Sequence, residues 1–70
     1  MDWHSTHARE ELLVALGGRV RVEVRGPSQK TRGFLLAAGR CAFLPRGTLH
    51  RLVNRSSTAA RYLYITAPTR

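Results

Sequence analysis

The residues of this chain that are best suited to metal binding or catalysis are three histidines and a glutamate. His4, His7 and His50 offer imidazole nitrogens, and Glu11 offers carboxylate oxygens. Donors of these two kinds suit borderline divalent ions such as Fe, Mn, Ni, Zn and Co. Glu11 opens the apolar stretch ELLVAL, where a carboxylate is costly to bury unless it is paired or coordinated. These residue types therefore indicate divalent-metal chemistry wherever the fold brings them together.

The segment GRCAFLPRGTLHRLVN holds a second concentration of informative residues. Gly39 turns the chain into a short apolar run, and Pro45 and Gly47 then bracket a tight turn. Proline fixes φ and glycine tolerates positive φ, so both residues suit that turn. His50 follows shortly after it, and Asn54 ends the segment with a side chain that can hydrogen-bond to nearby backbone. We expect one strand on each side of the turn, with His50 at the start of the second.

These residue types and their spacings resemble the second conserved motif of the cupin superfamily. In cupins the histidine at the place of His50 is usually a metal ligand. The resemblance covers residues 3–66 and implies a small single-domain cupin over residues 1–70. It also implies an all-β fold, namely a small antiparallel cupin β-barrel of the jelly-roll type. We expect about six strands, completed by a contribution from a partner chain.

The upstream segment HSTHAREELLVALGG resembles the first cupin motif. His7, Glu11 and Gly18 stand at the places of its second histidine, its glutamate and its closing glycine. Ser5 holds the place of the first histidine, and His4 precedes it by one residue. The resemblance implies one bound divalent transition metal (Fe, Mn, Ni, Zn or Co), with the ligands His7, Glu11 and His50 and with His4 as a candidate fourth.

The resemblance leaves two interpretations of function open, because cupins include dioxygenases, isomerases, decarboxylases, storage proteins and effector-binding modules. In the first, the chain is a metal-dependent enzyme of the oxygenase or isomerase type that acts on a small organic molecule. In the second, it is a non-catalytic module that binds a small ligand or a metal. Turnover that depends on Glu11 would favour the enzyme, and ligand-dependent melting without turnover would favour the module.

The net charge of +8 comes almost entirely from arginines scattered along the chain, since Lys30 is the only lysine. No dense basic run or DNA-binding motif accompanies them, so a nucleic-acid partner is not expected. A solvated basic surface is the simplest interpretation. Because guanidinium groups pair with carboxylates in two-pronged fashion, a small anionic ligand is the more specific one.

The pattern of residues predicts strands almost throughout. Valines alternate with charged residues in RVRVEVR, which is typical of a strand with one face in the core. Gly17 and Gly18 suit a two-residue hairpin turn before it. Cys41, Phe34 and Phe43 are expected in the core. A polar loop is expected over residues 26–33, and strands over residues 11–16, 19–25, 34–37, 41–44, 49–54 and 59–66.

Two of these strands, residues 11–16 and 59–66, are apolar on both faces and must be covered on both. A chain of 70 residues cannot supply two covers. We therefore expect a homodimer that buries one apolar sheet face or an exchanged edge strand between protomers. With one cysteine and no signal peptide or long apolar run, we expect no membrane association and a cytoplasmic location.

Overall fold

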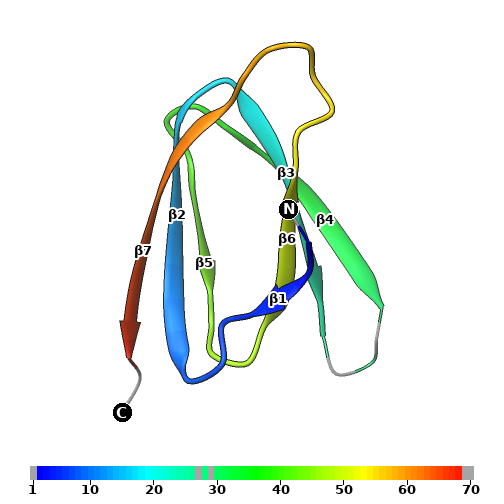
Figure 1. Cartoon of the computed structure of the whole chain (residues 1–70), viewed down its shortest axis with the longest axis vertical. Coiled ribbons are helices and arrows are strands. Elements are labelled where there is room, and N and C mark those ends of the chain that lie inside the picture. The colour runs from blue at the N-terminus through cyan, green and yellow to red at the C-terminus, as the bar shows by residue number, and fades with distance from the viewer. Residues whose placement is uncertain (1, 27, 29, 69–70) are drawn as a thin grey trace.

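The chain forms two antiparallel sheets that face each other (Figure 1). The computed structural model describes residues 2–26, 28 and 30–68. Within that part of the chain, no helix is long and apolar enough to span a membrane. The predicted all-β antiparallel fold is confirmed. One sheet has the order β1 (His4–Ser5), β6 (Leu49–Val53), β3 (Arg19–Arg25) and β4 (Thr31–Ala37), and the other has the order β5 (Cys41–Leu44), β2 (Arg9–Gly17) and β7 (Arg61–Pro68).

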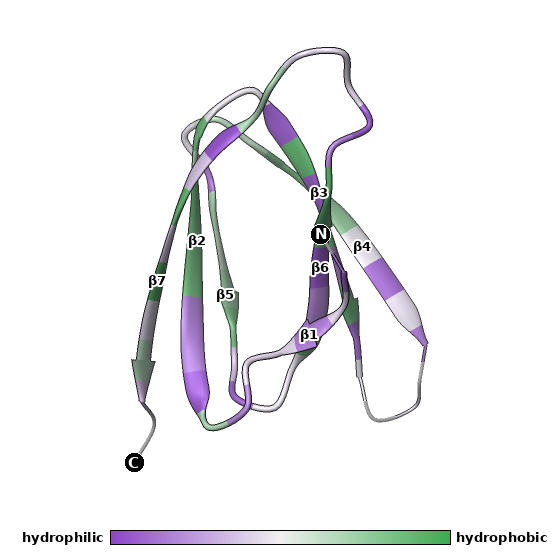
Figure 2. Cartoon of the chain, in the orientation of Figure 1, coloured by the Kyte–Doolittle hydropathy of each residue, from purple (hydrophilic) through white to green (hydrophobic). Residues whose placement is uncertain are grey.

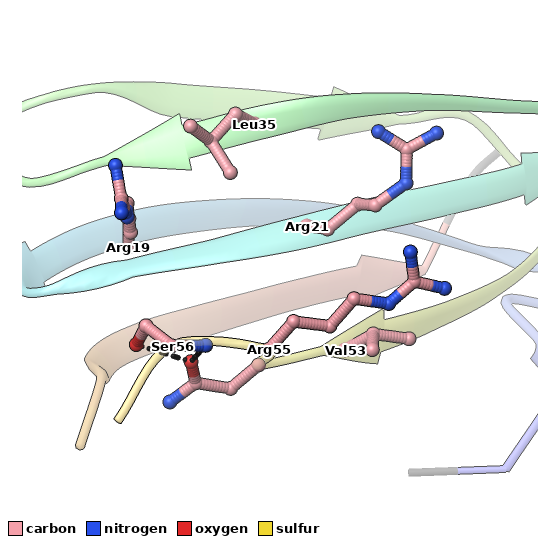
Figure 3. A pocket seen from close by; sticks show the side chains of 7 residues that line it. Arg19, Arg21, Leu35, Val53, Arg55 and Ser56 are labelled. Carbon is pink, nitrogen blue, oxygen red and sulfur yellow. Dashed lines mark hydrogen bonds between the residues drawn. The ribbon is translucent and has the colours of Figure 1, made fainter. Parts of the chain in front are cut away.

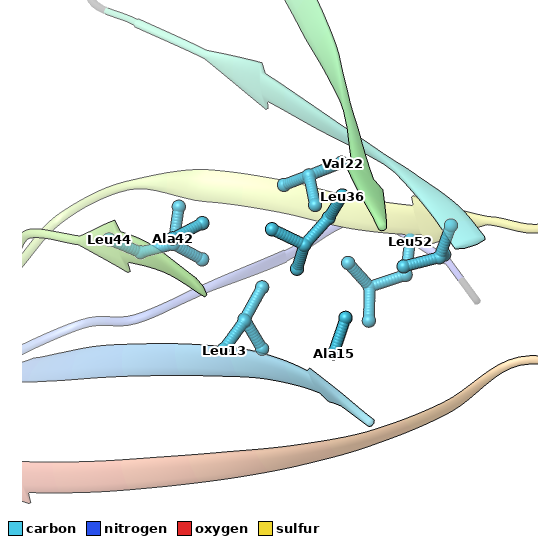
Figure 4. Close-up of a cluster of buried hydrophobic side chains, with 8 residues drawn as sticks. Leu13, Ala15, Val22, Leu36, Ala42, Leu44 and Leu52 are labelled. Atoms are coloured by element: carbon cyan, nitrogen blue, oxygen red, sulfur yellow. The ribbon is translucent and has the colours of Figure 1, made fainter. Parts of the chain in front are cut away.

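The core lies between the two sheets and is built from alternate residues of their strands (Figure 4). Along β3, Val20 and Val22 point into it, while Arg19 and Arg21 point outward. Figure 2 shows this alternation as green and purple bands. The period of two therefore places one residue type on each side of the sheet, as the sequence predicted. The buried apolar residues are Leu13, Ala15, Val20, Val22, Leu36, Ala42, Leu44 and Leu52.

The prediction of a hairpin at Gly17 and Gly18 is wrong. Strands β2 and β3 belong to different sheets, so these glycines carry the chain across the sandwich. Gly18 has a φ of 68°, and a Cβ added to it would lie 2.7 Å from the carbonyl oxygen of Ala59. The second glycine is therefore required by a close crossing of two chain segments. The sequence signal for the turn was real, but the turn joins two layers.

The expected burial of Cys41, Phe34 and Phe43 is also wrong. Cys41 is exposed, and Phe34 and Phe43 are exposed by 41% and 57%. In β5 the alternation places Ala42 and Leu44 inside, so Cys41 and Phe43 lie on the outer face. A short strand that is apolar at every position does not reveal which face is the inner one, because both choices bury two apolar residues.

The predicted strand positions agree with the structure apart from their ends. Strand β4 begins at Thr31, so the polar loop is shorter than residues 26–33. Residues 27 and 29 of that loop lie outside the described residues. The two-residue strand β1 was not predicted, and it pairs with β6 in the register His4↔His50.

Replacing Gly18 by Ala is expected to destabilise the fold by about 1–3 kcal/mol, because the new Cβ meets a backbone oxygen at a positive φ. For a domain of this size that is a fall in melting temperature of roughly 4–8 °C per kcal/mol. The matched control is Gly17→Ala, since a Cβ at Gly17 has no atom within 4 Å. Thermal unfolding of both variants checks this, and equal melting temperatures would contradict it.

Candidate metal centre

Three potential metal ligands converge between the two sheets. His4 comes from β1, His50 from β6 and Glu11 from β2 of the opposite sheet. One ligand atom from each lies within 4.8 Å of the others. A metal held at 2.0–2.2 Å by each donor keeps any two donors at most about 4.4 Å apart. The observed group is therefore within about half an ångström of a spacing that one ion can bridge.

His50 is the most buried member of the group, with an exposed fraction of 2%. Its Nδ1 lies 3.2 Å from the carbonyl oxygen of Thr48. Because a carbonyl only accepts, Nδ1 carries the hydrogen and donates it. The other ring nitrogen, Nε2, points at Glu11 and lies 3.1 Å from its Oε2. A backbone carbonyl thus orients the imidazole and aims Nε2 into the group, as is usual for metal-binding histidines.

His4 is oriented in the same way from the exposed side of the group. Its Nδ1 lies 3.3 Å from the carbonyl oxygen of Asp2, which leaves Nε2 without that hydrogen. The rings of His4 and His50 are 4.1 Å apart between centroids, at an interplanar angle of 63°. Their direct pairing across β1 and β6 places both side chains on the inner face of that sheet.

His7 lies apart from this group. It sits in the turn between β1 and β2 with a φ of 53°, and its side chain is exposed. Its N–H donates to the hydroxyl of Ser5 at 2.9 Å, so the residue at the place of the first cupin histidine holds this turn. Strand β2 begins only at Arg9. The alternation that would put His7 and Glu11 on one face is therefore interrupted between them.

Two threonines that sequence analysis did not single out fix the position of both histidine-bearing strands. Thr6 is buried, and its hydroxyl donates to the Pro45 carbonyl at 2.9 Å and accepts from the Thr48 N–H at 2.9 Å. The Thr48 hydroxyl donates to the same carbonyl at 2.7 Å. Threonine is common in exposed turns, so its type alone does not predict these hydrogen bonds between the two turns. The signal in the sequence was the place of each threonine within two residues of a motif histidine.

The group lies at one wall of a cavity of about 160 Å³. The remaining walls are apolar or aromatic, from Leu13, Leu52, Tyr62 and Tyr64. Both tyrosines belong to the edge strand β7 and are partly exposed, so the cavity opens beside them. A polar base with apolar and aromatic walls is typical of a site for a small organic molecule.

A chain of contacts on the outer face secures the strand that carries His4. Trp3 contacts two guanidinium groups, with that of Arg25 at 4.3 Å and that of Arg51 at 4.7 Å from its ring centroid. Arg51 in turn binds the buried Glu23 at 2.6 Å. The hydrogen bond from Arg51 lowers the pKa of Glu23 below its ordinary value, and Arg21 adds to this against the opposing effect of burial. The N-terminal segment is therefore held by cation–π contacts that rest on a charged pair.

Comparison with known proteins gives one family and a solved structure of similar fold. A family model described as "Cupin domain" matches residues 1–66. The crystal structure of Drosophila melanogaster CENP-C bound to CAL1 is similar in fold, with a TM-score of 0.88 at 18% sequence identity. The similarity covers 96% of this chain and 55% of that chain, so the chain spans about half the length of that structure's chain. No curated protein matches.

Acidification is expected to loosen this N-terminal contact chain. Because folding lowers the pKa of Glu23, its contribution to stability is present above the ordinary glutamate pKa of about 4.3 and is lost as the pH falls through the lowered value. Trp3 is the only tryptophan, so its fluorescence reports on the contact directly.

We expect urea unfolding, followed by that fluorescence, to show a falling stability as the pH drops below about 4.3. The variant Glu23→Gln should be less stable than the parent at pH 7 and should lose less stability on acidification. If the two proteins lost stability in parallel across that range, Glu23 would not be the titrating group.

Proposed function

The chain belongs to the cupin family, and from the arrangement of its central polar residues we propose that it is a metal-binding cupin. In this proposal His4, Glu11 and His50 hold one divalent transition metal, and a small organic molecule binds beside it in the cavity. The observation that carries it is the convergence of two histidine ring nitrogens and a carboxylate oxygen from three strands. The proposal also takes residues 1–70 as one domain with a cytoplasmic location.

The buried pair of Glu11 and His50 supports this function because stability alone gives little reason for it. Glu11 is exposed by 7% and His50 by 2%. Replacing both partners of a buried polar contact by apolar residues of similar volume is often neutral or stabilising. The core is small, so two polar residues in it displace apolar side chains that would stabilise the fold. The value of the pair is explained if a metal ion binds the two side chains.

Three protein ligands would leave coordination positions open toward the cavity. Two imidazole nitrogens and one carboxylate oxygen are the donor set of many non-haem Fe(II) oxygenases, and they also suit Mn, Ni, Zn and Co. When bound, such a metal supplies Lewis-acid or oxygen chemistry. Tyr62 and Tyr64 would position the organic ligand beside it with their rings and hydroxyls. Oxygenase or isomerase chemistry is the catalytic form of this proposal, and ligand binding without turnover is its non-catalytic form.

A second candidate role is protein assembly, favoured by the outer face of the β5–β2–β7 sheet. Cross-strand neighbours on that face form two apolar rows. Phe43, Ile65 and Leu63 in these rows are exposed by 57%, 54% and 51%. So large an exposed apolar surface marks an interaction site. The rows are Leu12, Phe43 and Ile65, followed by Val14, Cys41 and Leu63.

We propose that a second copy of the chain covers this face. Glu10 lies beyond one end of the apolar rows, and Arg61 lies beyond the other end. A two-fold axis through the middle of the rows would bring Glu10 of one protomer to Arg61 of its partner. The face is therefore self-complementary in charge as well as in apolarity, which a symmetric dimer requires. The likeness to a CENP-C structure determined with a partner protein, CAL1, agrees with an assembly role.

Metal content tests the principal proposal. Protein purified without an affinity tag is expected to contain about one equivalent of a transition metal per chain by elemental mass spectrometry. His50→Ala and His4→Ala should each lower the metal affinity, by more than the roughly 10- to 100-fold typical of losing a residue that only supports a ligand. His7→Ala is the matched control and should keep the metal. A loss in His7→Ala equal to that in His4→Ala, or a protein that stays empty after incubation with Fe, Mn, Ni and Zn, would contradict the proposal.

Sedimentation analysis tests the dimer. The parent protein should sediment as a dimer at micromolar concentration, and Ile65→Arg should sediment as a monomer because each interface would receive two buried charges. Leu35→Arg is the matched control, since Leu35 is exposed by 55% and Ile65 by 54%, and Leu35 lies on the other sheet. A monomeric parent, or a Leu35→Arg variant that also dissociates, would count against this interface.

A further inference from the structure

The outer face of the β1–β6–β3–β4 sheet carries an excess of arginine. The outward positions of β3 and β6 hold Arg19, Arg21, Arg25 and Arg51 with a single acid, Glu23. Glu23 already binds Arg51 at 2.6 Å and Arg21 at 3.4 Å. The positive charge of this face is therefore only partly compensated.

Arg19 and Arg55 have no acidic partner among the described residues. Both line a surface pocket of about 210 Å³, together with Arg21 (Figure 3). The side chains of Arg21 and Arg55 extend in the same direction, and their guanidinium groups lie at one end of the pocket. Arg19 stands at the other end, and the apolar side chains of Leu35 and Val53 lie along the pocket. The positive charges of these guanidinium groups repel one another, and a bound anion would offset that repulsion.

The turn that carries Arg55 is well ordered by its own hydrogen bonds. Asn54 Oδ1 accepts from the Ser56 N–H at 3.0 Å and from the Ser56 hydroxyl at 2.7 Å. The Asn54 amide donates to the Thr58 carbonyl at 2.9 Å. The structural role predicted for Asn54 is confirmed by these contacts. The backbone of Arg55 is held between Asn54 and Ser56, which lowers the entropic cost of presenting its guanidinium to a ligand.

Gly33 makes room for the second guanidinium of the pocket. A Cβ at this position would overlap the guanidinium of Arg21 and would lie 2.9 Å from its Nε. Arg21 therefore lies against the bare backbone of β4. The glycine at this point of the strand is explained by that contact, since a strand interior otherwise favours a side chain.

We propose that this pocket binds a small organic dianion, with carboxylate or phosphate groups at its two ends and a short apolar segment between them. One anionic group would pair with Arg21 and Arg55, and the other with Arg19, because guanidinium groups bind both oxyanions through paired hydrogen bonds. Leu35 and Val53 would contact the apolar segment. The site is separate from the metal centre, since β3 and β6 turn their arginines and their buried residues to opposite faces.

A small molecule fits these observations better than a nucleic acid does. Proteins that bind single-stranded nucleic acid rely on phosphate contacts along a groove and on exposed aromatic rings that stack with the bases. Here the uncompensated guanidiniums share one small pocket, and Trp3 is already covered by Arg25 and Arg51.

The test is an NMR titration of the ¹⁵N-labelled full chain with glutarate and, separately, with 3-phosphonopropionate, each of which carries an anionic group at both ends of a short apolar segment. At least one of these dianions should shift the amides of residues 19–21 and 53–56, with or without added zinc, and butyrate should bind more weakly. Arg19→Ala and Arg55→Ala should each weaken binding by about tenfold, as expected for one charge-assisted hydrogen-bonded contact. Gly33→Ala should weaken it by displacing Arg21.

The matched control is Arg46→Ala, which removes one positive charge from the exposed turn between β5 and β6 and should leave the affinity unchanged. An equal loss in Arg46→Ala would show that only net charge matters and would overturn the proposal. So would shifts centred on Glu11 and His50, the absence of binding by either dianion, or tighter, strongly salt-dependent binding of a single-stranded oligonucleotide to the same residues.

Discussion

The contact between Glu11 and His50 is the interaction on which the centre of this molecule depends. It joins β2 of one sheet to β6 of the other, with 3.1 Å between a carboxylate oxygen and an imidazole nitrogen. Both residues are buried in a core otherwise made of Leu, Val and Ala. Such a contact requires that the fold hold both partners in place, because a buried polar group without a partner would be costly. The polar turns around it meet this requirement.

The relative position of Glu11 and His50 is set at the lower end of the sandwich in Figure 1, where the β1–β2 turn and the β5–β6 turn are joined by hydrogen bonds. Thr6 and Thr48 exchange hydrogen bonds in both directions, and Gly47 donates its N–H to the His7 carbonyl at 2.8 Å. These contacts fix the starts of β2 and β6, and so the positions of Glu11 and His50. In so small a chain, hydrogen bonds between turns do the positioning that a larger core does elsewhere.

Much of the fold and part of the centre could be predicted from sequence, for identifiable reasons. The alternation along β3 and the glycine and proline turns predicted most strands, and motif spacing drew attention to Glu11 and His50. The outer position of Phe43 could not be predicted, because a strand that is apolar at every position does not indicate which of its faces points into the core. The sheet crossing at Gly18 depends on the distant Ala59 backbone, and the place of His4 depends on a turn at His7 with a positive φ. Both are tertiary effects that local pattern does not contain.

The most direct measurement is a crystal structure of the protein grown with zinc, with anomalous scattering recorded at the zinc absorption edge. We expect one strong peak between the two sheets, about 2.0–2.2 Å from Nε2 of His4, Nε2 of His50 and a carboxylate oxygen of Glu11. A map without a peak there, with Glu11 still bonded directly to His50, would contradict this expectation. A peak coordinated by His7 in place of His4 would show that the turn rearranges and that the ligand set proposed here is wrong.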